Sequence, residues 1–256
     1  MLIAALGSSF AAGPTLKPVA DRAAMRSSLN YPHRLATALG ADLVDLTVSG
    51  ATVGTILDTA QVIAPGVQFP PQIDGVPPTA DVVTLTAGGN DLRFIGSMLT
   101  TAWRRYDPNA RMGALLGPQY PGIPAPDPET IEALTGLLAR VVTAARRRSP
   151  RARVVLVDYL TVLGPGSRSS LVDFAPAELA AFRALQDALE RAFRDAATRS
   201  GAQLVAVSER SRDHAVGSAD PWVEDFVPDP RRTVGSFHPT AAGMAAVAEL
   251  LVTGLR

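Results

Sequence analysis

The sequence predicts an α/β fold, in which a parallel sheet carries helices on both of its faces. Short apolar runs of strand length alternate with longer segments of helical periodicity from one end of the chain to the other, and this alternation is typical of parallel sheets. The crossovers between successive strands should be right-handed. A chain of 256 residues, of which 47% are hydrophobic, can bury a large core. We therefore expect a single domain spanning residues 1–256.

Five segments have the length and composition of strands. The first is an apolar run that stops at Gly7, which suits a strand buried in a parallel sheet. The other four are rich in Val and Leu, and each ends at or just before a small or acidic residue. The predicted strands are residues 2–6, 43–48, 82–87, 153–158 and 203–207.

Four longer segments carry apolar residues at helical spacing. In residues 129–148 these residues form one face of a long amphipathic helix. Gly40 and Gly201 follow the ends of two other helical segments and suit C-caps, while Pro176 suits a first helical turn. Thr240 lies near the expected N-cap of the last helix. The predicted helices are residues 31–39, 129–148, 176–200 and 240–255.

Two stretches do not fit this alternation, and a third has helical spacing. Residues 64–79, with five prolines, and residues 105–128 are too long for plain connections, so we expect them to shape the mouth of a site. Apolar residues between 94 and 103 have helical spacing. They suit core or lid packing better than an acyl-chain channel.

Composition excludes several classes of function. The chain has 24 basic and 24 acidic residues, whereas a nucleic-acid binder would show a basic excess or stripe. The basic run at residues 146–148 falls at a helix end, where cations favour the helix dipole. There are no cysteines, so disulfides and thiolate metal sites are excluded. We expect no metal and no cofactor.

No apolar run reaches the roughly 18 residues of a spanning helix. The first six residues lack a basic n-region and form too short an apolar run for a signal sequence. We expect a soluble protein, cytoplasmic as the sequence stands and secreted if a leader has been removed. The oligomeric state does not follow from the sequence.

Residues suited to acyl transfer follow three predicted strands and precede the last helix. Ligands of open α/β sheets collect at the carboxyl ends of the strands. Ser9 lies at one such end, and His238 could take its proton, since a serine hydroxyl needs a base to act as a nucleophile. The N–H groups of Ser9 and Gly50 and the side-chain amide of Asn90 could hold an oxyanion. Glycine at position 50 allows close approach of the backbone.

Together these segments resemble the conserved blocks of the SGNH hydrolase superfamily, also called GDSL esterases and lipases. The resemblance implies a flavodoxin-like three-layer α/β/α sandwich with a five-stranded parallel sheet. It also implies a serine hydrolase that cleaves small-molecule or lipid esters through an acyl-enzyme. The residues of these segments are most similar to those of actinobacterial esterases and lipases. The matching segments are Gly7-Ser8-Ser9-Phe10, Gly50, Gly88-Gly89-Asn90-Asp91 and His238-Pro239.

The chain departs from the family pattern at its first block. The residue before the family nucleophile is usually Asp, and here it is Ser8, which leaves two adjacent serines. We assign Ser9 as the nucleophile because Phe10 follows it, as an apolar residue follows the family nucleophile.

A second departure concerns the residue that orients the base. The family places an Asp three residues before the histidine, and this chain has Gly235 there. We predict a Ser–His dyad in which the carbonyl of Gly235 or Ser236 accepts the Nδ1 proton of the imidazole. Asp225 or Asp229 could serve instead. With an ordinary histidine pKa, the rate should fall below about pH 6.5.

Two other functions are compatible with the same residues. The same chemistry could transfer the acyl group to another alcohol, and the same fold could serve as an inactive lipid- or carbohydrate-binding module. A nucleotide-binding protein is disfavoured because no Gly-rich phosphate loop follows the first strand. We interpret His33 as a surface or packing residue and Asp91 as a structural one. His214 could line the pocket, but it lacks the partners of a metal site.

Overall fold

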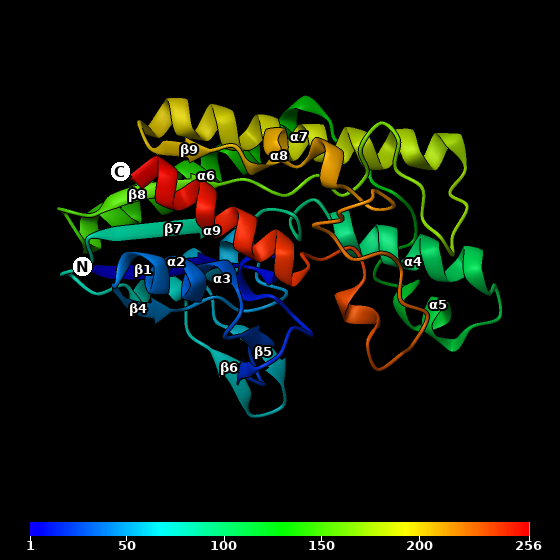
Figure 1. The fold of residues 1–256 in the computed structure, drawn as a ribbon, viewed down its shortest axis with the longest axis horizontal. Coiled ribbons are helices and arrows are strands. Elements are labelled where there is room, and N and C mark those ends of the chain that lie inside the picture. The colour runs from blue at the N-terminus through cyan, green and yellow to red at the C-terminus, as the bar shows by residue number, and fades with distance from the viewer. Residues whose placement is uncertain (256) are drawn as a thin grey trace.

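A sheet of five parallel strands runs through the centre of the molecule and carries helices on both faces (Figure 1). The computed structural model describes residues 1–255. Neighbouring strands are parallel throughout the order β4-β1-β7-β8-β9. The predicted α/β fold is confirmed. The strands are β1 (Leu2–Gly7), β4 (Asp42–Asp45), β7 (Val82–Thr86), β8 (Arg153–Val157) and β9 (Gln203–Val205).

The strand order reverses at the carboxyl end of β1. The chain passes from β1 to the edge strand β4 and then returns to β7, on the other side of β1. In open α/β sheets such a reversal leaves a crevice in which ligands bind. The segments that follow β1, β4 and β7 therefore converge on this crevice.

Two helical layers cover the sheet. Helices α2 (Tyr31–Leu39) and α9 (Ala241–Leu255) pack against each other on one face, while α3 (Val53–Leu57), α6 (Pro128–Arg148) and α7 (Pro176–Ser200) pack together on the other (Figure 1). Because both faces are covered, β1, β7 and β8 are buried along almost their whole length.

Two predicted strands are shorter than expected. The second ends at Asp45, because the carboxylate of Asp45 accepts hydrogen bonds from the N–H and the hydroxyl of Thr47 and turns the chain. The fifth ends at Val205, because Val207 already begins the short helix α8 (Val207–Arg210). The helix boundaries predicted from Gly40 and Gly201 are confirmed, and both glycines are left-handed C-caps.

Shorter elements lie between the predicted strands and helices, and apart from α4 (Phe94–Tyr106) the sequence pattern did not indicate them. Two antiparallel hairpins, β2–β3 and β5–β6, stand apart from the main sheet. Helix α4 buries Phe94, Met98 and Trp103, which favours the packing interpretation of that segment. The additional elements are α1 (Ser9–Ala12), β2 (Val19–Asp21), β3 (Arg26–Ser27), β5 (Gln61–Ala64), β6 (Val67–Phe69), η1 (Gln72–Gly75), α4 (Phe94–Tyr106), α5 (Arg111–Leu116), η2 (Arg212–His214) and η3 (Thr233–Gly235).

None of the helices within residues 1–255 combines the length and the apolar character needed to cross a bilayer.

The last helix, α9, is the most apolar of the long helices, and its N-terminus is capped by a side chain. The hydroxyl of Thr240 accepts a hydrogen bond from the N–H of Gly243 at 3.1 Å.

Replacing Thr240 by Ala removes this cap and should lower the free energy of unfolding by about 1 kcal/mol. Urea unfolding followed by circular dichroism measures the loss. Thr198→Ala is the matched control, because Thr198 is exposed in the last turn of α7, far from any N-cap, and bonds only the carbonyl four residues before it. The control should change stability by less than about 0.5 kcal/mol; equal losses in the two variants would contradict the cap.

Candidate active site

The hydroxyl of Ser9 and the imidazole of His238 meet at the carboxyl end of β1. Ser9 is the first residue of α1, directly after the turn that ends the strand. Its Oγ lies 2.8 Å from Nε2 of His238, although the two residues are 229 positions apart in the sequence. Each residue is only 9% exposed. The structure therefore places the predicted nucleophile and the predicted base within hydrogen-bonding reach.

The turn that presents Ser9 is held on both sides. A Cβ on Gly7 would lie 2.7 Å from the carbonyl oxygen of Thr86, so only glycine allows β1 and β7 to stay this close. The buried side chain of Gln72 donates to the Gly7 carbonyl at 3.0 Å and accepts the Gly7 N–H at 2.8 Å. Sequence analysis did not single out Gln72, and no motif pointed to it.

A main-chain carbonyl orients His238. The carbonyl oxygen of Ser236 lies 2.9 Å from Nδ1. Because a carbonyl can only accept, the proton must sit on Nδ1, and Nε2 is left as the acceptor for the Ser9 hydroxyl. The carbonyl of Gly235 accepts the backbone N–H of His238 instead. Of the two carbonyls predicted, it is that of Ser236 that contacts the ring.

The two alternative carboxylates have other partners. Asp225 accepts hydrogen bonds from the N–H and the hydroxyl of Ser170, at 2.7 and 2.9 Å. Asp229 accepts the N–H of Arg231 at 2.9 Å. No carboxylate within residues 1–255 is hydrogen-bonded to His238. Burial therefore dominates the titration of the imidazole and lowers its pKa to about 4, although the Ser236 carbonyl acts in the opposite direction.

Two backbone donors at the site are free for an incoming group. The N–H groups of Ser9 and Gly50 bond no acceptor among residues 1–255. Gly50 has a φ of +82°, in the left-handed region that favours glycine. Asn90 donates one amide hydrogen to the carbonyl of Ala51 at 2.8 Å, which fixes the orientation of its side chain. Its second amide hydrogen remains available.

Asp91 ties the Asn90 loop to the Gly50 loop. Both carboxylate oxygens lie 3.2 Å from the N–H of Val53, the first residue of α3. Burial raises the pKa of Asp91, and the hydrogen bond from Val53 opposes this. The contact agrees with the structural interpretation of Asp91.

The neighbouring Ser8 faces away from the imidazole. It is 1% exposed, and its Oγ lies 3.0 Å from the hydroxyl of Tyr159, the second residue after β8. The same hydroxyl accepts the N–H of Gly89 at 3.1 Å, and a Cβ on Gly89 would lie 2.8 Å from the Tyr159 ring. Burial raises the pKa of Tyr159 to about 12, which keeps it protonated. Tyr159 thus joins the loops after β1 and β7, a role that sequence analysis missed.

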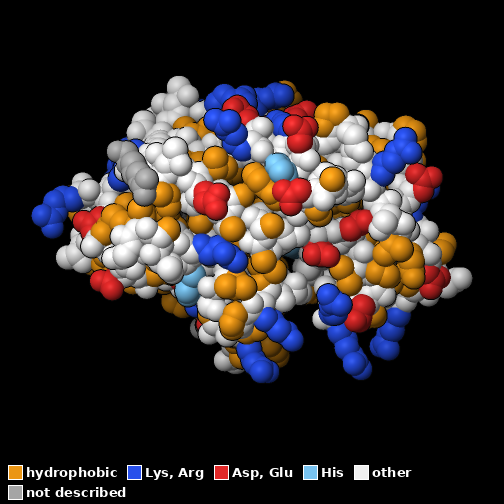
Figure 2. Space-filling view, in the orientation of Figure 1, with side chains coloured by type: hydrophobic (Ala, Val, Ile, Leu, Met, Phe, Trp, Pro, Cys, Tyr) orange, Lys and Arg blue, Asp and Glu red, His pale blue; other side chains and the backbone are white. Residues whose placement is uncertain are grey.

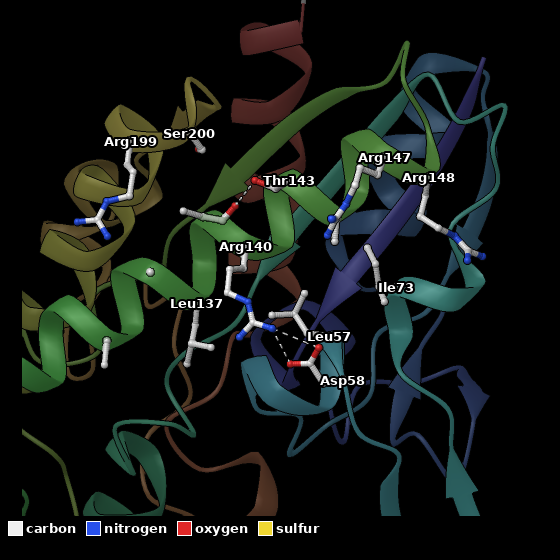
Figure 3. A pocket seen from close by; sticks show the side chains of 14 residues that line it. Leu57, Asp58, Ile73, Leu137, Arg140, Thr143, Arg147, Arg148, Arg199 and Ser200 are labelled. Atoms are coloured by element: carbon white, nitrogen blue, oxygen red, sulfur yellow. Dashed lines mark hydrogen bonds and ion pairs between the residues drawn. The ribbon is translucent and has the colours of Figure 1, made fainter.

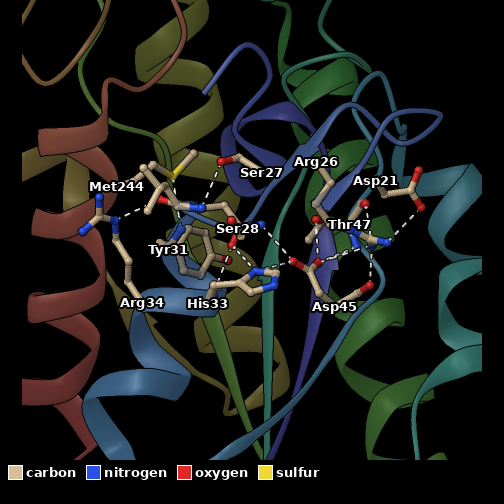
Figure 4. A network of polar contacts seen from close by, with 12 residues as sticks. Asp21, Arg26, Ser27, Ser28, Tyr31, His33, Arg34, Asp45, Thr47 and Met244 are labelled. Carbon is tan, nitrogen blue, oxygen red and sulfur yellow. Dashed lines mark hydrogen bonds and ion pairs between the residues drawn. The ribbon is translucent and has the colours of Figure 1, made fainter. Parts of the chain in front are cut away.

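A polar network anchors the segment that leads from β4 toward Gly50 (Figure 4). At its centre, Asp45 accepts hydrogen bonds from Asn30 at 2.8 Å and from the Thr47 hydroxyl at 2.6 Å. Burial acts to raise the pKa of Asp45, but hydrogen bonds from His33, Asn30 and Thr47 outweigh it and lower the pKa. The guanidinium of Arg26 bonds the carbonyls of Asp45 and Thr47. His33 joins this network through its Nδ1, which lies 2.8 Å from Oδ1 of Asn30 and 3.3 Å from the carboxylate of Asp45.

The third histidine lies outside the dyad. The ring of His214 stacks on Trp222, with centroids 3.9 Å apart, and its Nδ1 lies 2.8 Å from the carbonyl of Asp220. In the described part of the chain, no three His, Asp or Glu side chains are placed to share a metal ion.

A large cavity lies away from the dyad. It has a volume of about 1120 Å³ and follows the outer side of α6. The ion pair between Arg140 and Asp58, at 3.0 Å, crosses it (Figure 3). Neither Ser9 nor His238 lines it, so the chemistry is not in this groove.

Comparison with known proteins identifies the family. The pattern that defines the GDSL-like lipase/acylhydrolase family matches residues 5–246. The chain belongs to this family. It is therefore a carboxylic ester hydrolase with an SGNH-type fold, as the sequence resemblance implied.

Relatives of this GDSL-like hydrolase come from Streptomyces. A protein called Lipase 2, from Streptomyces coelicolor, is 32% identical over 96% of this chain and 82% of its own length. An extracellular lipase from Streptomyces rimosus has the same fold, with a TM-score of 0.71 and 22% identity over 99% of both chains. A phospholipase A1 from Streptomyces albidoflavus has a TM-score of 0.73 and 22% identity over 99% of this chain and 98% of its own.

The buried imidazole shifts the expected pH dependence of this GDSL-like hydrolase. A base must be neutral to accept a proton, so kcat/KM should stay constant from neutral pH to about pH 5 and fall as the pH approaches about 4. Initial rates on a soluble ester across this range test the prediction. An acid limb centred near pH 6.5, the ordinary histidine value, would contradict it.

The same shift makes a folding control necessary. Below about pH 6.5 the unfolded chain binds a proton at this histidine that the folded chain does not bind until about pH 4. Stability is therefore lost as the pH falls through this window. Circular dichroism at each pH separates titration of the base from unfolding.

Proposed function

We propose that this GDSL-like hydrolase cleaves carboxylic esters through an acyl-enzyme formed on Ser9, with His238 as the base and no carboxylate in the machinery. The observation that carries the proposal is the chain of two hydrogen bonds from Ser236 through His238 to Ser9. A histidine held in the correct tautomer, with its free nitrogen 2.8 Å from a serine hydroxyl, is the arrangement that nucleophilic catalysis needs.

The first half-reaction forms the acyl-enzyme. Nε2 of His238 takes the proton of Ser9 as Oγ bonds the ester carbonyl carbon, and the carbonyl electron pair moves onto its oxygen. In this proposal the N–H groups of Ser9 and Gly50 and the free amide hydrogen of Asn90 donate to this oxyanion. When the intermediate collapses, the bond to the alkoxy oxygen breaks and the proton on Nε2 leaves with the alcohol. Water then repeats the cycle and releases the acid.

The carbonyl of Ser236 supplies orientation without charge. A carboxylate would stabilise the imidazolium through its full negative charge, whereas a carbonyl offers only a dipole. We therefore expect the protonated form of His238 to be short-lived. The oxyanion donors and the exclusion of water then account for more of the rate than in an enzyme with a full triad.

Lipid esters are the substrates that we propose. A relative that is 32% identical is named as a lipase, and two proteins with the same fold are a lipase and a phospholipase A1. We treat residues 1–256 as one catalytic domain, because the dyad unites the two ends of the chain. A panel of esters graded by acyl length, including a phospholipid and an acetylated sugar, tests the substrate class.

Replacing Ser9 by Ala should reduce the hydrolysis of a short p-nitrophenyl ester by at least about 10⁴-fold, because the nucleophile is lost. Ser8→Ala is the matched control one position away. It removes a hydrogen bond to Tyr159 but no attacking group, and should retain measurable turnover. Loss of activity in Ser8→Ala with activity retained in Ser9→Ala would reverse the assignment.

Replacing Asp225 or Asp229 by Asn should lower kcat by less than about tenfold, because neither carboxylate contacts His238. Loss of a true triad carboxylate costs on the order of 10⁴-fold. Steady-state rates of the two variants distinguish these cases. A decrease in kcat on the order of 10⁴-fold in either variant would show that a carboxylate orients the base during turnover.

A further inference from the structure

Exposed hydrophobic side chains gather around the mouth of the site. In the described part of the chain ten large hydrophobic side chains are exposed, and six of them lie on three segments that border the dyad or the Gly50 loop. Scattered exposed hydrophobics are ordinary, but a gathering beside an active site indicates an interaction surface. We call these six residues the apolar edge. They are Val19, Met25, Val62, Ile63, Val67 and Val234.

Direct contacts connect the apolar edge to the oxyanion loop at Ser49. The carbonyl of Met25 accepts the Ser49 hydroxyl at 3.2 Å, so the β2–β3 hairpin lies on one side of Ser49. The side chain of Gln61, at the base of the β5–β6 hairpin, donates to the Ser49 carbonyl at 2.9 Å. Gly50 follows Ser49 directly. Both hairpins therefore flank the proposed oxyanion hole.

A cavity joins the apolar edge to the other wall of the site. It has a volume of about 270 Å³ and lies between Leu16, Val19 and Met25 on one side and Val234 on the other. Val234 belongs to η3, four residues before His238. Thus the apolar edge extends from the oxyanion loop to the segment that carries the base.

Unpaired cations accompany the apolar edge. Lys17 and Arg22 flank Val19, and Arg231 and Arg232 precede Val234; all four are exposed, and none forms an ion pair within residues 1–255. Three of the four arginines that line the α6 groove differ, since each of them pairs with a carboxylate: Arg140 with Asp58, Arg148 with Asp74 and Arg199 with Glu132. Figure 2 shows hydrophobic side chains next to Lys or Arg side chains at the lower edge of the molecule, where β5 and β6 project in Figure 1.

We propose that the apolar edge docks this hydrolase onto the surface of an anionic phospholipid aggregate, with Val62 and Ile63 entering the boundary between head groups and acyl chains. The inference rests on the proposed function, and it names the physical state of the substrate. Apolar residues backed by cations bind anionic lipid surfaces through buried apolar area and charge attraction together. An ester in that surface then lies beside Gly50 and Ser9.

The cations argue against a second copy of the chain as the occupant. In a two-fold dimer the same patch would meet itself, and four unpaired positive charges on each side would be brought together. An anionic lipid surface neutralises these charges. Charge complementarity therefore favours lipid over self-association.

Sedimentation with lipid vesicles tests the proposal. Ser9→Ala is the background, so that bound vesicles are not hydrolysed. It should bind vesicles of equal parts phosphatidylglycerol and phosphatidylcholine and bind pure phosphatidylcholine much more weakly. Adding Lys17→Ala with Arg22→Ala should weaken binding roughly thirtyfold, from the usual contribution of two cations at such a surface. Adding Val62→Asp with Ile63→Asp should weaken it at least about tenfold.

Matched controls lie on remote surfaces. Leu115→Asp replaces a side chain on α5 that is 68% exposed, against 69% for Val62. Arg147→Ala with Arg194→Ala removes two exposed cations from α6 and α7. Both controls should bind vesicles within about threefold of the background, given that the attraction decays within a Debye length of the surface. Equal weakening by edge and control variants would overturn the proposal.

Assays with Ser9 intact separate docking from catalysis. The Val62→Asp, Ile63→Asp variant should hydrolyse a soluble short-chain ester at the wild-type rate and vesicle-bound ester at least about tenfold more slowly. An equal loss on both substrates would mean a folding defect and overturn the proposal. Vesicle binding without any ester hydrolysis would contradict the proposed function but support the docking proposal. A dimer that this variant dissociates, with no vesicle binding, would assign the edge to self-association.

Discussion

The hydrogen bond between the Ser236 carbonyl and the His238 ring is the interaction on which the site depends. It fixes the proton on Nδ1, and only then can Nε2 accept the Ser9 hydroxyl. Since no carboxylate is hydrogen-bonded to the ring in the described part of the chain, burial outweighs the Ser236 carbonyl and lowers the pKa of His238. A neutral imidazole held by a neutral acceptor is the result, and it gives this GDSL-like hydrolase its expected tolerance of acid.

The site is rigid because three loops are cross-linked by buried polar side chains. Tyr159 joins the loop after β1 to the loop after β7, and Asp91 joins the loop after β7 to α3. Gln72 clamps the turn at Gly7. None of these side chains is proposed to react. Each holds a donor or nucleophile in position, which is how a preorganised oxyanion hole avoids reorganisation during the reaction.

The sequence predicted the strands, the long helices and the pairing of Ser9 with His238 because each has a local signal. Apolar runs mark buried strands, Gly40 and Gly201 mark helix ends, and Ser9 and His238 match family blocks. Tyr159 and Gln72 have no such signal, since their partners are 151 and 65 positions away. The two hairpins were also missed, because short exposed strands lack a buried apolar face. The choice of Ser236 over Gly235 depended on ring orientation, which only coordinates show.

The contact between Gly89 and Tyr159 also limits how this family can diverge. Any side chain at position 89 would collide with the aromatic ring, so a relative with Ala there needs a smaller residue at position 159. That exchange would release the hydroxyl of Ser8 as well. A relative with the usual Asp at position 8 would then have a different residue beside that carboxylate. Residues 8, 89 and 159 are therefore expected to vary as a set, and the residue type at one of these positions should predict the types at the other two.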